Sequence, residues 1–253
     1  MEKRYYKEYS YNLGRDMEFV SYGENGRGKP ILLVPSQDGK FYDWENFGMI
    51  DNIRDYIDSG KVQLFSFDTI DQETVSAMNQ APYDRVRRHE AWYNYVIEEL
   101  VPRACSLNNT GFRPAVCGVS MGAYHAANFF FRRPDIFDGL IAMSGLYDCQ
   151  YMYGDYMDEY VYNNSPAVFL WGMPQDHEWI RLYNRSRAVV CVGQGAWEDE
   201  MAAATRRLDQ VLKAKGINVW VDYWGHDVNH DWPWWKKQMR YFLPYVLGGE
   251  AGE

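Results

Sequence analysis

The chain has 253 residues, of which 47% are hydrophobic and 17% aromatic, and its formal net charge at pH 7 is −9. This length suits one large α/β domain with a sizeable core. The acidic balance argues against nucleic acids and membranes as partners, because both select basic surfaces. The acidic balance instead favours a soluble protein.

The 10 Trp and 21 Tyr residues exceed what a core needs. Both side chains bury apolar area while keeping a polar group. Some are therefore expected to line a cleft or a contact between subunits, so a homo-oligomer stays an open alternative. The four cysteines show no C-x-x-C spacing and are expected to be reduced. The sequence contains neither a signal-peptide pattern nor an apolar run of about 18 residues, so a cytoplasmic protein is expected.

The chain opens with a tyrosine-rich stretch that alternates loosely around a turn at 12–15. This pattern predicts a β-hairpin with strands at 5–11 and 17–22. Farther on, short continuous apolar runs are typical of strands buried on both faces of a sheet. They predict strands at 31–34, 62–67, 137–143, 188–192 and 217–223. Helical periodicity predicts helices at 43–59, 82–107, 199–215 and 231–246.

From residue 30 onward, predicted strands and helices alternate. This alternation requires an α/β fold with a mostly parallel sheet and helices on both faces. No linker or internal repeat interrupts it, so residues 1–253 are predicted to form one domain. Residues 146–187 are rich in Tyr, Asp, Asn and Met and show weak periodicity. They are interpreted as a small cap over the C-terminal edge of the sheet, although plain connecting helices fit the pattern equally well.

The most informative stretch is Gly118-Val119-Ser120-Met121-Gly122. An apolar run fit for a buried strand precedes it, and small residues compatible with a helix follow it. The pattern G-x-S-x-G between a strand and a helix is the nucleophile elbow. Its glycines permit the sharp turn, and the N-terminus of the helix offers free N–H groups beside the serine. Ser120 is therefore predicted to be a nucleophile.

A serine nucleophile needs a base, usually a histidine oriented by a carboxylate, and in a fold with this elbow the chain order is Ser, Asp or Glu, His. His89 lies in a charged run of the predicted helix 82–107 and is expected to be solvated or paired with a charge. His125 lies on the helix after the elbow and is expected to pack or to cap. Only His226 and His230 follow the last predicted strand, where the base belongs.

His226 and His230 also have the i, i+4 spacing of a metal-binding pair. Glycine and proline nearby make this stretch a loop, and no Glu general base stands between the two histidines as it does in H-E-x-x-H. We therefore expect neither a metal nor a cofactor.

The carboxylate is expected in the loop after strand 188–192, where Glu198, Asp199 and Glu200 are consecutive. Some of these charges are expected to stabilise the N-terminus of the following helix. Reasoning from the residues alone does not choose among the three.

Several stretches together resemble a known family: the elbow, the sequence RRPDIF at 132–137, the sequence AMSG at 142–145 and the sequence HDWPWW at 230–235. They resemble a family of esterases with the α/β-hydrolase fold, which includes S-formylglutathione hydrolases, feruloyl and enterochelin esterases and mycolyltransferases. The last stretch is similar to that family's H-x-W-x-x-W segment, whose histidine is the base. The resemblance thus implies an α/β-hydrolase fold, with an added N-terminal hairpin, in which His230 is the base.

The same resemblance implies the other site residues. The loop 193–199 is similar to the glycine-rich loop of the mycolyltransferases, which places the carboxylate at Asp199 with Glu198 as the alternative. An oxyanion hole is also implied, with the N–H of Met121 as one donor. The second donor is assigned to Gln37, in a loop that departs from the family's His-Gly or Asp-Gly pattern.

The resulting expectation is a serine carboxylic-ester hydrolase that forms an acyl-enzyme with a triad of Ser120, His230 and Asp199 and acts on a small-molecule ester. Two alternatives stay open. One is an acyltransferase that uses the same triad with an alcohol or sugar as acceptor. The other is a binding protein with a hydrolase fold and no activity, which a complete triad in the right order disfavours.

Overall fold

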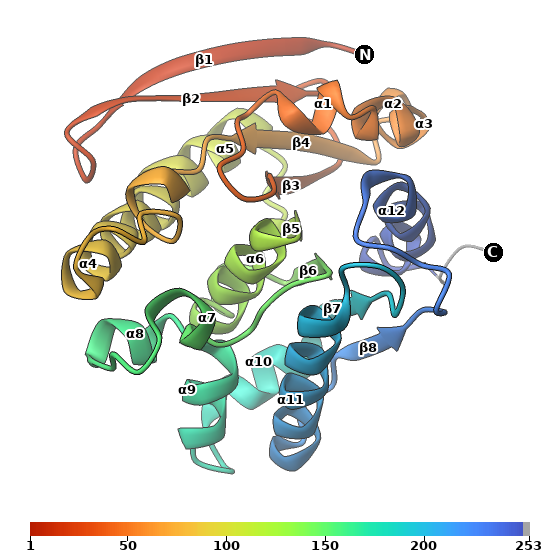
Figure 1. The fold of residues 1–253 in the computed structure, drawn as a ribbon. Coiled ribbons are helices and arrows are strands. Elements are labelled where there is room, and N and C mark those ends of the chain that lie inside the picture. Colours follow the sequence, from red (N-terminus) through yellow and green to blue (C-terminus); the bar gives the residue numbers. More distant parts are fainter. Residues whose placement is uncertain (250–253) are drawn as a thin grey trace.

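The protein is built on one eight-stranded sheet with the order β1-β2-β4-β3-β5-β6-β7-β8, seen in a computed structural model that describes residues 1–249 (Figure 1). Strands β1 (Lys3–Ser10) and β2 (Arg15–Tyr22) form an antiparallel hairpin, and β2 pairs antiparallel with β4 (Val62–Phe67). The remaining strands run parallel to β4: β3 (Lys29–Val34), β5 (Ala115–Val119), β6 (Gly139–Met143), β7 (Arg187–Val192) and β8 (Trp220–Tyr223). The predicted hairpin and mostly parallel sheet are confirmed.

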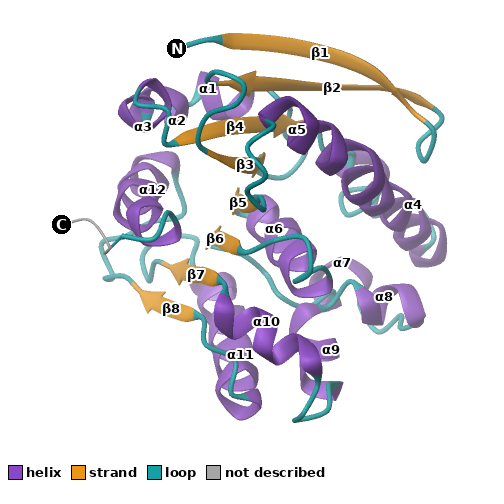
Figure 2. Cartoon of the chain, turned by 180° about the vertical axis from the view of Figure 1, so that it is seen from behind, coloured by secondary structure: helices purple, strands orange, loops and turns teal. Residues whose placement is uncertain are grey.

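Helices cover both faces of this sheet (Figure 2). Successive strand side chains point to opposite faces, so Leu32 packs on one side while Ile31 and Leu33 pack on the other. One face is covered by α4 (Pro82–Asn94), α5 (Val101–Asn108), α6 (Met121–Arg132) and α11 (Asp199–Lys215). The other face is covered by α1 (Asp43–Asn46), α2 (Met49–Asn52), α3 (Arg54–Asp58) and α12 (Trp232–Val246).

The predicted continuous helix at 43–59 is wrong. The chain instead forms the three short helices α1, α2 and α3. Gly48 adopts a φ of 75° between the first two, and Ile53 leaves helical geometry between the second and third. Of the predicted apolar stripe of Phe47, Ile50, Ile53 and Ile57, the three isoleucines are buried and Phe47 is exposed. The periodicity therefore identified most of the buried face but not the breaks between the helices.

The predicted helix at 82–107 is confirmed as one helical rod with an irregular middle. Between α4 and α5 the stretch Tyr95–Leu100 is π-helical. Pro102 has no N–H and cannot donate to the carbonyl of Glu98 in the α-helical pattern, so wider turns just before it accommodate the missing bond.

Residues 146–187 contain α7 (Gln150–Tyr153), α8 (Glu159–Asn163), α9 (Pro166–Gly172) and α10 (Glu178–Arg185). Helix α9 packs against α6 and α11, and α8 packs against α4 and α9. This segment therefore lies along the helical layer of one face (Figure 1). Its interpretation as a cap stays a prediction.

The expectation that His89 is solvated or paired with a charge is wrong. The residue is only 1% exposed, and its ring stacks on that of His125 with centroids 5.2 Å apart. The face of α4 that carries His89 packs against α6. The residues next to His89 in the sequence are charged, so the sequence pattern did not indicate this burial. Burial, reinforced by the neighbouring His125 ring and by the positive charge of Arg132, holds the pKa of His89 well below its usual value.

We expect this buried imidazole to make folding sensitive to mild acid. The pKa is depressed in the folded state, so the unfolded chain binds a proton at His89 that the folded chain excludes. The resulting loss of stability begins near pH 6.5 and grows by about 1.4 kcal/mol per pH unit as the pH falls. Urea unfolding at pH 7.0 and 5.5 should show that the wild type loses about 1 kcal/mol more than His89→Leu between these pH values. Equal losses in both proteins would show that folded His89 accepts its proton normally.

Candidate active site

Ser120 stands at the turn between β5 and α6 with a backbone φ of 55° and ψ of −125°. A non-glycine residue rarely adopts such a conformation, and strain of this kind persists only where the surroundings hold it. Here the Ser120 N–H donates to the carbonyl of Met143 at 2.9 Å, and its carbonyl accepts from the N–H of Ala123 at 2.9 Å. The half-buried serine is thus held out at the carboxyl end of the sheet.

The glycines on either side are required by close approaches of the backbone. A Cβ atom on Gly118 would lie 2.0 Å from the carbonyl oxygen of Gly122, and one on Gly122 would lie 2.1 Å from the carbonyl oxygen of Pro35. Both distances are far inside van der Waals contact. The predicted elbow is therefore confirmed, and the loop after β3 lies directly against it.

His230 lies in the loop between β8 and α12 and reaches Ser120 from there. Its Nε2 is 2.8 Å from Ser120 Oγ, within hydrogen-bond reach of a base for this hydroxyl. His226, the other candidate from the same loop, is exposed and contacts the carbonyl of Gln194 at 3.3 Å. The structure thus brings His230, and not His226, to the nucleophile.

The carboxylate beside His230 belongs to Glu198, and the assignment to Asp199 is wrong. Glu198 is fully buried, and its Oε2 lies 3.3 Å from His230 Nδ1. Asp199 is exposed as the first residue of α11, where its charge favours the helix N-terminus. The left-handed φ of 67° at Trp197 turns the chain just before Glu198, so that this side chain enters the protein and the next one leaves it.

Two further residues hold Glu198, and the sequence reasoning missed both. The Ser144 hydroxyl donates to Glu198 Oε1 at 2.6 Å, and the indole N–H of Trp235 donates to Ser144 Oγ at 3.0 Å. The ring of Trp235 also meets that of His230 edge to face, with centroids 4.9 Å apart. Two features of the sequence could have indicated them. Ser144 directly follows the predicted strand 137–143, and Trp235 is the last tryptophan of the H-x-W-x-x-W segment.

The loops that carry Glu198 and His230 are hydrogen-bonded to each other. The His230 N–H donates to the carbonyl of Ala196 at 3.0 Å, and the side-chain oxygen of Asn229 accepts from the Ala196 N–H at 2.8 Å. These contacts fix the distance between acid and base through the backbone.

The predicted oxyanion donors lie on two elements that meet at the elbow. Met121 begins α6 directly after the nucleophile. Gln37 is exposed in the loop after β3, and its side chain donates to Ser76 Oγ at 2.8 Å. Within residues 1–249, neither the Met121 nor the Gln37 backbone N–H donates to a protein acceptor. Both are therefore free to receive an oxyanion.

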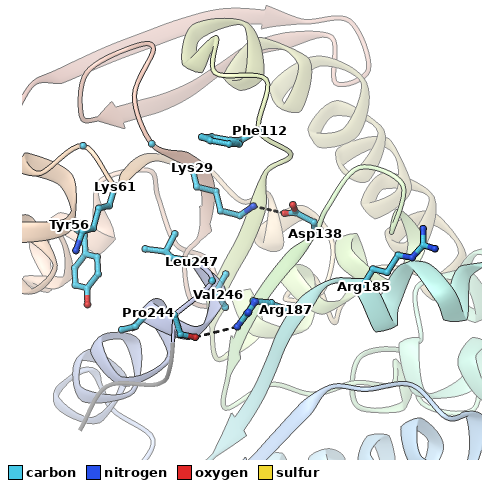
Figure 3. Close-up of a pocket in the computed structure, with 14 residues that line it drawn as sticks. Lys29, Tyr56, Lys61, Phe112, Asp138, Arg185, Arg187, Pro244, Val246 and Leu247 are labelled. Atoms are coloured by element: carbon cyan, nitrogen blue, oxygen red, sulfur yellow. Dashed lines mark hydrogen bonds and ion pairs between the residues drawn. The ribbon is translucent and has the colours of Figure 1, made fainter.

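A cavity of about 790 Å³ lies at the amino ends of the parallel strands, opposite the end that carries Ser120 (Figure 3). Its lining includes Lys29 and Arg187, which open β3 and β7, and Lys29 pairs there with Asp138 at 2.6 Å. Because these are the amino ends of parallel strands, the cavity is separated from Ser120 by the length of the sheet. It does not belong to the candidate active site.

The strained serine at a strand–helix turn, with a histidine from the loop after the last strand, defines a serine hydrolase of the α/β-hydrolase fold. A family model described as "Putative esterase" matches residues 10–245. The chain belongs to this esterase family and is a carboxylic ester hydrolase. A search of curated proteins found no match. Within the described residues, no helix is long and apolar enough to cross a membrane.

Solved structures with the same fold differ widely in sequence. A ferulic acid esterase is 16% identical with a TM-score of 0.76, over 98% of this chain and 98% of that chain. An S-formylglutathione hydrolase from Agrobacterium tumefaciens is 14% identical with a TM-score of 0.72, over 99% of this chain and 95% of that chain. MPT51 (FbpC1) from Mycobacterium tuberculosis is 15% identical with a TM-score of 0.64, over 96% of this chain and 98% of that chain. At these identities the likeness shows the α/β-hydrolase fold.

Proposed function

We propose that the protein hydrolyses small carboxylic esters through an acyl-enzyme formed on Ser120. The observation that carries this proposal is the continuous chain of contacts from Glu198 through His230 to Ser120, with 3.3 Å and 2.8 Å between the paired atoms. A serine hydroxyl becomes a useful nucleophile only when an oriented base can take its proton.

In the first half-reaction, Ser120 Oγ attacks the ester carbonyl while its proton passes to His230 Nε2. The tetrahedral intermediate places its negative oxygen between the N–H groups of Met121 and Gln37. His230 then returns the proton to the leaving alcohol, and the acyl group stays on the serine. Glu198 accepts from Nδ1–H throughout and stabilises the imidazolium.

In the second half-reaction, water replaces the alcohol. His230 removes a proton from the water as it attacks the acyl carbonyl, and the same proton restores Ser120 when the acid leaves. No other group is needed to balance the reaction.

A second cavity, of about 550 Å³, is a candidate site for the part of the substrate remote from the ester. It lies between α11 and the segment that joins β6 to β7. It shares Asp148 and Arg207 with a smaller cavity that is also lined by Leu146 and Glu200. Glu200 lies in the first turn of α11, two residues beyond Glu198. The size of the second cavity is in the range of small-molecule sites.

Incubation with p-nitrophenyl acetate tests the proposal. We expect a burst of p-nitrophenol of about one equivalent followed by steady turnover, because p-nitrophenolate is a good leaving group and acylation should be faster than deacylation. Acid quenching followed by peptide mass spectrometry should find one acetyl group on Ser120. Turnover without this adduct would contradict the acyl-enzyme. If an added alcohol or sugar captured most of the acyl group as a new ester, the activity would be transfer rather than hydrolysis.

A further inference from the structure

The loop that carries Gln37 is held along its length by the segment that follows β4. Gln37 donates to Ser76 Oγ at 2.8 Å, as noted above, and the carbonyl of Gly39 accepts from the hydroxyl of Thr69 at 3.1 Å. The N–H of Phe41 donates to Asp68 at 2.9 Å. The position of the loop therefore depends on its contacts with residues 68–76.

Asp71 is the buried centre of this contact and is only 1% exposed. Its Oδ2 accepts from the backbone N–H of Asp38 at 3.1 Å. Its Oδ1 lies 2.9 Å from Nε2 of His125, which is fully buried. A carboxylate only accepts, so this histidine nitrogen is the donor. One buried carboxylate thus binds the residue after Gln37 and a side chain of α6 at once.

This bridge joins the two halves of the proposed oxyanion hole. His125 is four residues after Met121, so it lies one turn along α6 from the first donor. Asp38 directly follows Gln37, the second donor. The connection His125–Asp71–Asp38 therefore ties the helix that carries one N–H to the loop that carries the other. Asp38 itself has a φ of 60°, so the loop is held in a conformation that it would otherwise rarely adopt.

We propose that Asp71 and His125 are positioning residues that set the separation of the two oxyanion donors. The inference rests on the proposed function, in which these N–H groups receive the oxyanion. It assigns a role in the reaction to two residues that do not touch the substrate. Stabilisation by such donors depends on distances near 2.9 Å, so a displaced loop weakens transition-state binding while leaving ground-state binding nearly unchanged.

The test compares Asp71→Ala with Asp71→Asn. Alanine removes both hydrogen bonds. Asparagine keeps the shape, and its oxygen can accept from the Asp38 N–H while its NH₂ group donates to His125. That donation requires the other histidine tautomer, and His125 Nδ1 has no hydrogen-bond partner within residues 1–249 that the change would displace. Asparagine should therefore rescue the loop position.

Active sites are counted by titration with a p-nitrophenyl phosphonate, so that misfolded molecules do not enter kcat. We expect Asp71→Ala to lower kcat for p-nitrophenyl acetate by about 10- to 100-fold with KM changed by less than about threefold. The inhibition constant of a trifluoromethyl ketone, whose adduct places an oxyanion in the hole, should rise in parallel. Asp71→Asn should stay within about fivefold of the wild type. His125→Leu removes the hydrogen bond between α6 and Asp71. Its kcat should lie between those of Asp71→Ala and Asp71→Asn.

His89→Leu is the matched control, because it removes a buried imidazole that stacks on His125 but makes no hydrogen bond to Asp71. Its kcat per titrated site should equal that of the wild type. If Asp71→Ala only reduced the number of active sites, with kcat and ketone affinity per site unchanged, the positioning role would be wrong. Failure of the proposed function has a different signature, since the wild type itself would then show no turnover that depends on Ser120.

Discussion

Ser120→Ala will lower kcat/KM for p-nitrophenyl acetate by at least about 10⁴-fold. The substitution removes the hydroxyl oxygen that lies 2.8 Å from His230 Nε2, and with it the acyl-enzyme route. Any residual rate must come from direct attack of water, which the oxyanion donors still assist. Alanine also fits the strained backbone no worse than serine, so the thermal unfolding midpoint should stay close to that of the wild type.

Ser59→Ala is a suitable control. Ser59 is exposed at the end of α3, where its hydroxyl donates to the carbonyl of Tyr56 at 3.2 Å. Its loss should leave kcat/KM unchanged. Hydrolysis by Ser120→Ala at the rate of the wild type would remove Ser120 from its proposed role and would also refute the acyl-enzyme.

Glu198→Gln will lower kcat by about 10⁴-fold, whereas Asp199→Asn will stay within about threefold of the wild type. The glutamine has nearly the same shape but no charge, so it cannot stabilise the imidazolium that forms at His230. Its NH₂ group also favours the wrong tautomer of the histidine. Steady-state kinetics of the two variants, measured side by side, checks the prediction.

The effect of Glu198→Gln should exceed that of an ordinary buried hydrogen bond because of what surrounds the carboxylate. Ser144 donates to its second oxygen, and Trp235 donates in turn to Ser144. Both hydrogen bonds act on a buried group, where they are stronger than in water. Equal losses in Glu198→Gln and Asp199→Asn would leave the assignment of the acid without support. A large loss in Asp199→Asn alone would reverse it.

Local chemistry sufficed to predict the elbow and the alternation of strands and helices along the chain. The clash that a side chain on Gly118 would meet is with Gly122 and Ala123, only a few residues away, whereas the clash at Gly122 is with the distant Val34 and Pro35. Continuous apolar runs likewise report burial on both faces of a strand, whatever its neighbours are. The same reasoning placed His226 and His230 where the base belongs, because parallel strands bring their carboxyl ends together, and the family resemblance then favoured His230.

Tertiary structure alone decided which neighbours complete the site. Glu198 and Asp199 are adjacent and chemically alike, and only the turn at Trp197 determines which of them faces His230. The buried environment of His89 comes from a helix far along the chain.

The bridge from His125 through Asp71 to Asp38 likewise joins three segments that no spacing rule relates. Hydrogen bonds between side chains depend on positions to within about half an ångström. Sequence patterns specify which face of an element is buried, but such positions follow only when the elements have packed together.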